Sequence, residues 1–161
     1  MRHIISLQLE NESGALSRVA GLFSARGFNI ESLTVAPTND ATLSRMTVVS
    51  IGGEDIIEQI VKQLNKLIDV VTVVNLTATE HIERELALVK IDVDPSTQAD
   101  IDQHIDDYGG KIVDVNEDTY TVEIAGKSQR VTDFLASLDA TKILEVSRTG
   151  VTGVCQKREY N

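Results

Sequence analysis

The apolar residues of this chain switch between two periods, in an order that occurs twice along the sequence. In residues 3–10 apolar and polar side chains alternate, which predicts a strand of a half-buried sheet. From Ser13 the apolar residues recur every three or four positions, which predicts a helix that ends at Gly27. A chain that alternates in this way must pack helices against a sheet, and this requirement restricts the possible folds to a few.

Each half of the chain follows the order βαββαβ. The expected strands of the first half are 3–10, 29–36, 42–51 and 69–77, and those of the second are 85–93, 111–116, 119–125 and 142–148. The expected helices carry apolar stripes at Leu16, Val19, Ala20 and Phe23; at Ile57, Ile60, Val61 and Leu64; at Ile101, Ile105 and Tyr108; and at Val131, Phe134, Leu135 and Leu138. The fold class is therefore α+β, with two ferredoxin-like domains at 1–78 and 83–161, joined near Ala78–Glu83.

The end of the chain and the small size of each half lead to two further expectations. The segment 149–161 is polar and is expected to be loose, so that Cys155 is an incidental surface or tail cysteine. Each half is small for a stable core and leaves open sheet faces and edges. We therefore expect the chain to form a homodimer.

Charge and composition exclude several classes of partner. The 161 residues carry a net charge of −10, which disfavours binding to nucleic acid and to anionic membranes. A single cysteine suits a reducing compartment, and neither a signal peptide nor an apolar stretch of membrane-spanning length is present. The expected location is the cytoplasm.

Motifs for metal binding and catalysis are weak. Residues 92–96 begin like a calcium loop, but Thr97 stands where that loop needs Gly and Gln103 where it needs Glu. The three histidines show no zinc-ligand spacing, and the chain has no glycine-rich nucleotide motif, nucleophile elbow or cysteine with a matched histidine. The sequence gives no reason to expect an enzyme or a metal site.

The most informative local feature is the turn 11–14, which leads from the first strand directly into the first helix. Several N–H groups at the start of a helix lack intrahelical partners, and the helix dipole favours an anion there. Gly14 has no Cβ, so a ligand can approach the backbone closely. The turn therefore predicts a site for a small carboxylate or phosphate, with an ordinary capped helix as the alternative.

Side chains near this turn suit an α-amino acid. Asn11 and Asn29 offer hydrogen-bond donors and acceptors for an ammonium and a carboxylate, and Ala15, Leu16 and Ile30 suit an aliphatic side chain. We expect the turn and the start of the second strand to lie near each other, at a sheet or dimer edge. Asn29 could equally be the residue at which the chain leaves the first helix.

These residues also carry a family resemblance. The segments LENESGALSRVAGLFSARGFNIESLTVAPT, LSRMTVVS, QLNKLIDV, ERELALVKI, FLASL and EVSRTG resemble the small regulatory subunits of acetolactate synthase (acetohydroxyacid synthase). The resemblance runs along nearly the whole chain and is most specific from Leu9 to Pro37. The N-terminal half resembles an ACT domain, the amino-acid-binding module of many biosynthetic regulators.

The resemblance implies a regulatory subunit without catalysis of its own, in branched-chain amino-acid biosynthesis. Such a chain binds the thiamine-diphosphate-dependent catalytic subunit, raises its activity and makes it sensitive to feedback by valine. The resemblance further implies that thiamine diphosphate, Mg²⁺ and FAD belong to the catalytic subunit only, and that this chain carries no cofactor.

The resemblance also implies a valine site at the interface of two ACT domains. The implied ligand residues are Gly14, Ala15 and Leu16 through their N–H groups, Asn11 from the same chain, and Asn29 and Ile30 from the neighbouring chain. The second half has no comparable turn, because its counterpart is 94–97 and Pro95 lacks an N–H group. We therefore expect no equivalent valine site there and assign that half to contact with the catalytic subunit.

Three other functions remain open. The chain could be a stand-alone ACT-type sensor that serves another enzyme or a transcription regulator. It could be a small ferredoxin-like enzyme such as an acylphosphatase, with Arg18 and an asparagine handling the anion; Arg45 is a further candidate for an anion contact. It could also be a purely structural dimerisation subunit.

Overall fold

The computed structural model describes residues 1–139 and 142–157, which form two compact units. The first unit comprises Met1–Ile82 and the segment from Val151 onward, and the second comprises Glu83–Gly150. Each unit has a sheet and a buried apolar cluster of its own.

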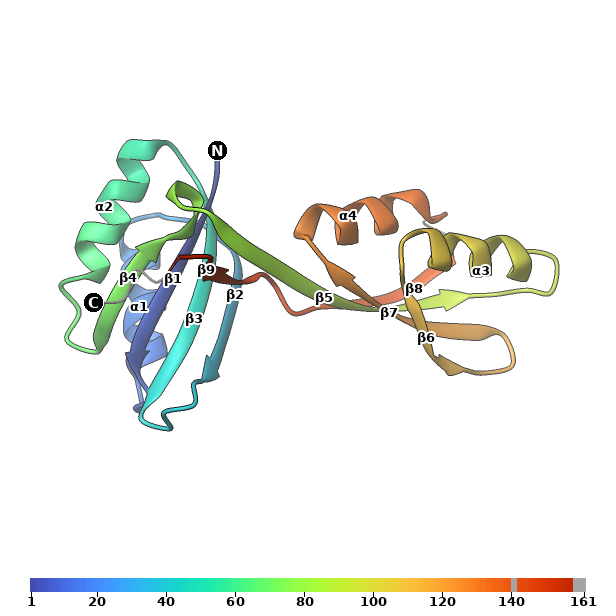
Figure 1. Ribbon diagram of the computed structural model, residues 1–161, viewed down its shortest axis with the longest axis horizontal. Coiled ribbons are helices and arrows are strands. Elements are labelled where there is room, and N and C mark those ends of the chain that lie inside the picture. Colours follow the sequence, from blue (N-terminus) through green and yellow to red (C-terminus); the bar gives the residue numbers. More distant parts are fainter. Residues whose placement is uncertain (140–141, 158–161) are drawn as a thin grey trace. The chain divides into compact units, whose positions relative to one another are not determined.

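The first unit has the predicted order of strands and helices. Its elements are β1 (Arg2–Glu10), α1 (Ala15–Ala25), β2 (Ile30–Pro37), β3 (Leu43–Ile51), α2 (Glu54–Leu64), β4 (Val70–Asn75) and a short 3-10 helix η1 (Leu76–Ala78). The four strands form an antiparallel sheet in the order β2-β3-β1-β4 (Figure 1). This strand order is that of a ferredoxin-like fold, and it leaves β2 at one edge of the sheet.

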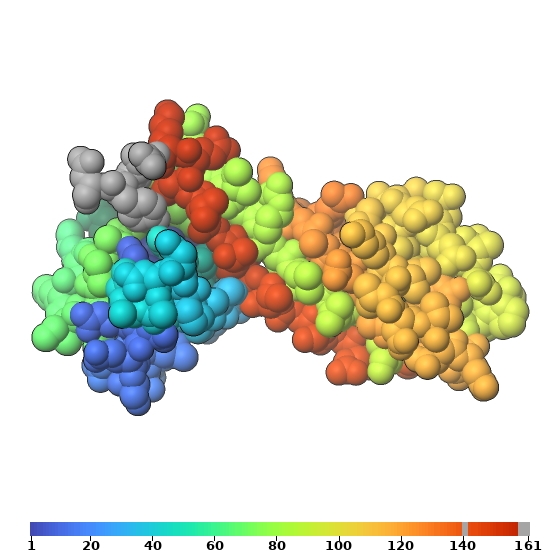
Figure 2. All heavy atoms as spheres, turned by 60° about the horizontal axis from the view of Figure 1, so that its bottom comes forward, coloured from blue at the N-terminus to red at the C-terminus, as the bar shows by residue number. Residues whose placement is uncertain are grey.

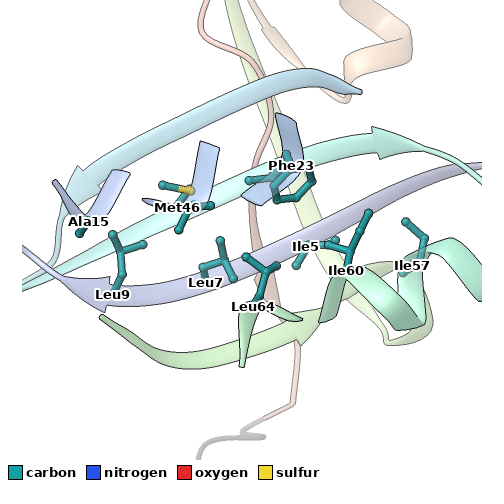
Figure 3. Close-up of a cluster of buried hydrophobic side chains, with 11 residues drawn as sticks. Ile5, Leu7, Leu9, Ala15, Phe23, Met46, Ile57, Ile60 and Leu64 are labelled. Atoms are coloured by element: carbon teal, nitrogen blue, oxygen red, sulfur yellow. The ribbon is translucent and has the colours of Figure 1, made fainter. Parts of the chain in front are cut away.

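Alternation along β1 places Ile5, Leu7 and Leu9 on the sheet face that α1 and α2 cover (Figure 3). These side chains are at most 2% exposed and pack with Phe23 of α1 and Leu64 of α2. Full burial of an aliphatic side chain of this size stabilises a fold by roughly 1.5–3 kcal/mol, so this cluster holds the unit together.

One part of the predicted helix stripe is wrong. Leu16 is 42% exposed, and the buried positions of α1 are Ala15, Val19 and Phe23. The helix begins at Ala15 and rests on a row of residues spaced by four, so the apolar side chain of Leu16 points away from the core.

The second unit repeats the architecture of the first. Its elements are β5 (His81–Asp92), α3 (Gln98–Asp107), β6 (Lys111–Val115), β7 (Thr119–Gly126), α4 (Ser128–Ser137) and β8 (Ile143–Arg148). The strand order β6-β7-β5-β8 is equivalent to that of the first sheet. Apolar side chains of β5 and β7 pack against α3 and α4 over one face, so the predicted fold class of two ferredoxin-like domains is confirmed.

The C-terminal segment departs from the prediction. Residues Thr152–Cys155 form a strand, β9, which pairs with the start of β5, and the N–H of Gln156 donates to Glu80 O at 2.9 Å. Figure 2 shows this red segment beside light-green residues of β5. The expected loose tail 149–161 is therefore wrong up to residue 157, and its residues 158–161 lie outside the described part. The four-residue strand is too short to be recognised from its own pattern.

Val151 explains why the segment returns to the first unit. Its side chain is 2% exposed and packs with Ile4, Val49 and Leu76. Cys155 is half-buried against this cluster instead of lying free on a tail. The expected second domain 83–161 thus ends at Gly150 in the structure, and the strand expected to start at residue 85 begins earlier, at His81.

An ion-pair cluster fixes the first turn of the second unit. Lys142 Nζ lies 2.7 Å from Asp94 Oδ2 and 3.7 Å from Asp92 Oδ2. The hydrogen bond from Lys142, together with one from Ser96, holds the pKa of Asp94 well below its usual range. A lysine side chain therefore pairs with both acidic residues that resemble a calcium loop and offsets one of their two charges.

We expect Val151→Ala to loosen the first unit selectively. The change removes two buried methyl groups and should cost about 1–3 kcal/mol. Amide hydrogen exchange should then increase in β1 and β3 but not in β7. Val154→Ala is the matched control on β9, because Val154 is 58% exposed. Equal exchange in the two variants would contradict the assignment of Val151 to this core.

We expect Asp94→Asn to destabilise the second unit at pH 7. A carboxyl with a lowered native pKa stabilises the fold above its unfolded pKa of about 3.9, and this contribution is lost as the pH falls through the native pKa. The difference between variant and wild type should therefore shrink below about pH 4. Tyrosine fluorescence during urea unfolding reports on this unit, because Tyr108 and Tyr120 belong to its core. Asp106→Asn, an exposed change on α3, should have little effect at either pH.

Candidate functional site

The turn between β1 and α1 presents unpaired backbone donors. Gly14 has a φ of 91° and forms the N-cap of α1 without any side-chain cap. Among the described residues no hydrogen bond reaches the N–H groups of Gly14, Leu16 or Ser17, and that of Ala15 donates to Glu12 O at 3.3 Å. The helix start is therefore open to an anion, unlike that of an ordinary capped helix.

A shallow pocket of about 210 Å³ lies beside this turn. Of the predicted site residues, Asn11, Ala15 and Leu16 line it. The end of β2, Val35–Pro37, forms another part of its wall and was missed in the sequence. The register places Pro37 opposite Ser44 and Ser44 opposite Leu9. This part of the wall could therefore have been predicted if the strand order had been known.

The side chain of Asn11 is held in one orientation. Its backbone N–H donates to Thr42 O at 2.7 Å, and its Nδ2 donates to Ala41 O at 3.0 Å. These bonds leave the side-chain oxygen Oδ1 able to accept a hydrogen bond, and Asn11 lines the pocket. An ammonium group is a suitable donor to this oxygen.

Asn29 and Ile30 do not meet the turn within one chain. Ile30 pairs with Ser50, which pairs with His3 at the start of β1, whereas the turn follows the end of β1. The 11-residue helix α1, about 16 Å long, separates the two ends of the sheet. The expectation that they lie near each other is therefore wrong inside a single domain, and only a second copy can bring them together.

Both residues also have contacts in their own chain. The backbone oxygen of Asn29 accepts a hydrogen bond from Ser50 Oγ at 2.7 Å, while the residue itself is exposed. The side chain of Ile30 packs partly against the core of the first unit. Asn29 therefore has the more available side chain of the two.

Arg18 forms a two-pronged ion pair beside the turn. Its Nε and Nη2 lie 2.5 and 2.6 Å from the two carboxylate oxygens of Asp69, a residue that is 4% exposed. The hydrogen bond raises the pKa of Arg18 and lowers the pKa of Asp69, in spite of the opposing effect of burial. Asp69 thus engages two of the three guanidinium nitrogens. Arg45 donates to Ser6 Oγ on the opposite sheet face.

The equivalent turn of the second unit is closed. Asp94 Oδ1 accepts the N–H groups of Ser96 at 3.0 Å and of Thr97 at 3.2 Å, and Asp94 O accepts that of Gln98 at 3.0 Å. Because Pro95 has no N–H group, this helix start has few donors left for a ligand. The second unit therefore lacks the open helix start on which the prediction of an anion site rests.

A larger hollow of about 470 Å³ lies elsewhere in the first unit, between α2 and the start of β1. Its wall carries Glu54, Glu58 and Lys62, and none of the predicted site residues lines it. Within residues 1–139 and 142–157, no group of three or more His, Cys, Asp or Glu side chains could hold a metal ion. Over the same residues, no helix has the length and apolar character needed to span a bilayer.

Comparison with known proteins gives one consistent result. The family described as "AHAS small subunit-like ACT domain" matches residues 5–72, and "Small subunit of acetolactate synthase" matches residues 84–157. The chain is 54% identical to the acetolactate synthase isozyme 3 small subunit of Salmonella typhimurium, over 96% of this chain and 95% of that protein. It is 42% identical to the acetolactate synthase small subunit of Bacillus subtilis, over 100% and 96%.

A solved structure supports the same assignment. The crystal structure of the acetolactate synthase small subunit from Thermotoga maritima has 36% sequence identity and a TM-score of 0.89, and the match covers 98% of each chain. Agreement in fold and sequence over the full length contradicts the alternative of a small ferredoxin-like enzyme such as an acylphosphatase. The chain belongs to the family of acetolactate synthase small subunits, which are regulatory and not catalytic subunits of that enzyme.

Proposed function

We propose that the turn 11–16 binds L-valine and that this binding regulates the acetolactate synthase catalytic subunit. The observation that carries the proposal is the open start of α1, where the N–H groups of Gly14, Leu16 and Ser17 have no partner in the described chain. Donors in this position suit the α-carboxylate, and Asn11 Oδ1 suits the α-ammonium. Ala15 and the exposed Leu16 provide apolar contacts for an aliphatic side chain.

The site is completed by a second copy of the chain. β2 is an edge strand of eight residues, about 26 Å long. If two β2 strands pair antiparallel about a two-fold axis, the start of each lies beside the end of the other. This pairing brings Asn29 and Ile30 of one copy to the pocket that Val35–Pro37 of the other copy lines. A homodimer with two shared valine sites follows.

Regulation then works by linkage. Valine shared between two chains favours one arrangement of the ACT dimer, and that arrangement is less able to activate the catalytic subunit. The ligand shifts the balance only through its different affinity for the two arrangements, typically by about 1–3 kcal/mol. Without valine the dimer activates its partner.

The second unit supplies contact with the catalytic subunit in this proposal. Its sheet exposes apolar side chains, among them Leu88, Val113 and Leu144, which are 40–54% exposed. Exposed apolar groups of this kind are common at protein–protein interfaces. The complex is placed in the cytoplasm, in keeping with the single cysteine of the chain.

Gly14→Asp should abolish inhibition by valine while activation of the catalytic subunit persists. The variant places a side chain and a negative charge at the proposed position of the ligand carboxylate. The measurement is acetolactate synthase activity of the reconstituted holoenzyme against valine concentration. Gly14→Ala is the matched control, since it has the same backbone strain at a φ of 91° without the charge, and should retain part of the sensitivity. Full sensitivity in Gly14→Asp would refute the site.

Asn29→His should weaken inhibition by valine in the same assay, by roughly tenfold or more in the half-inhibitory concentration. The change removes an amide that the proposed dimer aims at the neighbouring pocket. Asn65→His is a suitable control at another exposed asparagine, at the end of α2. Unchanged inhibition would mean that Asn29 does not contact the ligand and only marks the point at which the chain leaves α1.

A further inference from the structure

The guanidinium of Arg18 has one nitrogen that its ion pair does not use. Nε and Nη2 bind Asp69, whereas Nη1 has no hydrogen-bond partner in the described chain. This nitrogen faces the turn, because a Cβ built on Gly14 would lie 2.9 Å from it. The Arg18 side chain is 46% exposed and lies outside the pocket, so a ligand must extend from the pocket onto the helix start to reach it.

The position of the Arg18 guanidinium is fixed before a ligand binds. Asp69 is 4% exposed and holds two of the three guanidinium nitrogens, so the direction of Nη1 is set without a ligand. Asp69 is itself anchored, because its backbone oxygen accepts the N–H of Glu10 at 2.8 Å. A donor that is held in place before binding loses little freedom when the ligand arrives, which increases affinity.

The charges at the turn leave a place for an anion. A cation near the start of a helix is unfavourable to the helix dipole unless negative charge lies close to it. Asp69 supplies part of that charge at the far edge of the guanidinium, and Glu12 of the turn adds to it. The edge with Nη1 lies next to Gly14, at the helix start whose N–H groups at Gly14, Leu16 and Ser17 have no partner in the described chain. A carboxylate at that edge would accept from both the backbone and the side chain.

We propose that Arg18 is a ligand-binding residue of the turn, whose Nη1 donates a charge-assisted hydrogen bond to the α-carboxylate while Asp69 keeps the guanidinium in position. This inference rests on the proposed function and names the charged group that recognises the amino acid. It also gives Gly14 a second role, because any side chain there displaces Nη1. The carboxylate of Gly14→Asp would pair with Arg18 in place of the ligand.

The test compares two ligands that differ only at the carboxyl group. Isothermal titration of the full-length chain with L-valine and with L-valinamide gives the ratio of their affinities. Removing Arg18 should lower this ratio by about tenfold to a hundredfold, the range for a hydrogen bond to a charged group. The fall should come from weaker valine binding, with valinamide binding nearly unchanged.

The variants are chosen to keep the fold intact. Arg18→Met alone would leave Asp69 buried and unpaired, so the main variant is Arg18→Met with Asp69→Asn, which removes both charges. Arg18→Lys keeps the charge but cannot bind Asp69 and the ligand together, and should lower the ratio by less. Arg26→Met removes a charge at the other end of α1 and should leave the ratio unchanged.

The outcomes separate this inference from the proposed function. A lowered ratio in the double variant, with Arg26→Met unchanged, supports the role of Arg18. If the wild-type chain binds valine and the double variant keeps the same ratio, the inference is overturned while the valine site stands. If the wild type binds no valine, alone or with the catalytic subunit, the proposed function and this inference both fail.

Discussion

The ion pair between Arg18 and Asp69 joins the three segments on which the candidate site depends. It links the first turn of α1 to the loop before β4, and the backbone of Asp69 is bonded to the end of β1. The turn with Gly14 in the left-handed conformation lies between these fixed points. Only the Asp69 side of this pair is buried. Ion pairs often add little to stability, but they can specify one local arrangement, and here the helix start beside the pair is open.

The two units have the same architecture but differ in the charges at the turn before their first helix. Asp69 lies directly before β4 in the first unit, and Lys142 lies at the equivalent position, directly before β8, in the second. The partner of Lys142 is Asp94, which lies in the turn before α3. The acid therefore caps its own helix start, whereas in the first unit the charge in the helix is the cation Arg18. Because the acid lies in the turn only in the second unit, the N–H groups of that helix start have partners there, whereas those of Gly14, Leu16 and Ser17 have none in the described chain.

The sequence predicted the elements of both units because their apolar periods are regular, and because glycines follow α1 and α3, at Gly27 and Gly109. It could not predict β9, whose four residues gain their structure from pairing with β5 and from the burial of Val151. Among the predicted site residues, Asn11, Ala15 and Leu16 follow from the turn itself and line the pocket beside it. Val35–Pro37 and Asp69 were missed, since their proximity depends on strand order and on a contact between residues 51 positions apart.

The central claim is that each ligand site combines the turn of one chain with Asn29 of another, and mixed dimers test it most directly. Co-expression of Gly14→Asp and Asn29→His chains with different tags, followed by tandem purification, gives dimers with one variant of each kind. Neither pure variant has an intact shared site, but the mixed dimer has one. Titration with L-valine should therefore show one site per mixed dimer at near wild-type affinity. No recovered binding would mean that the turn and Asn29 do not meet across two chains.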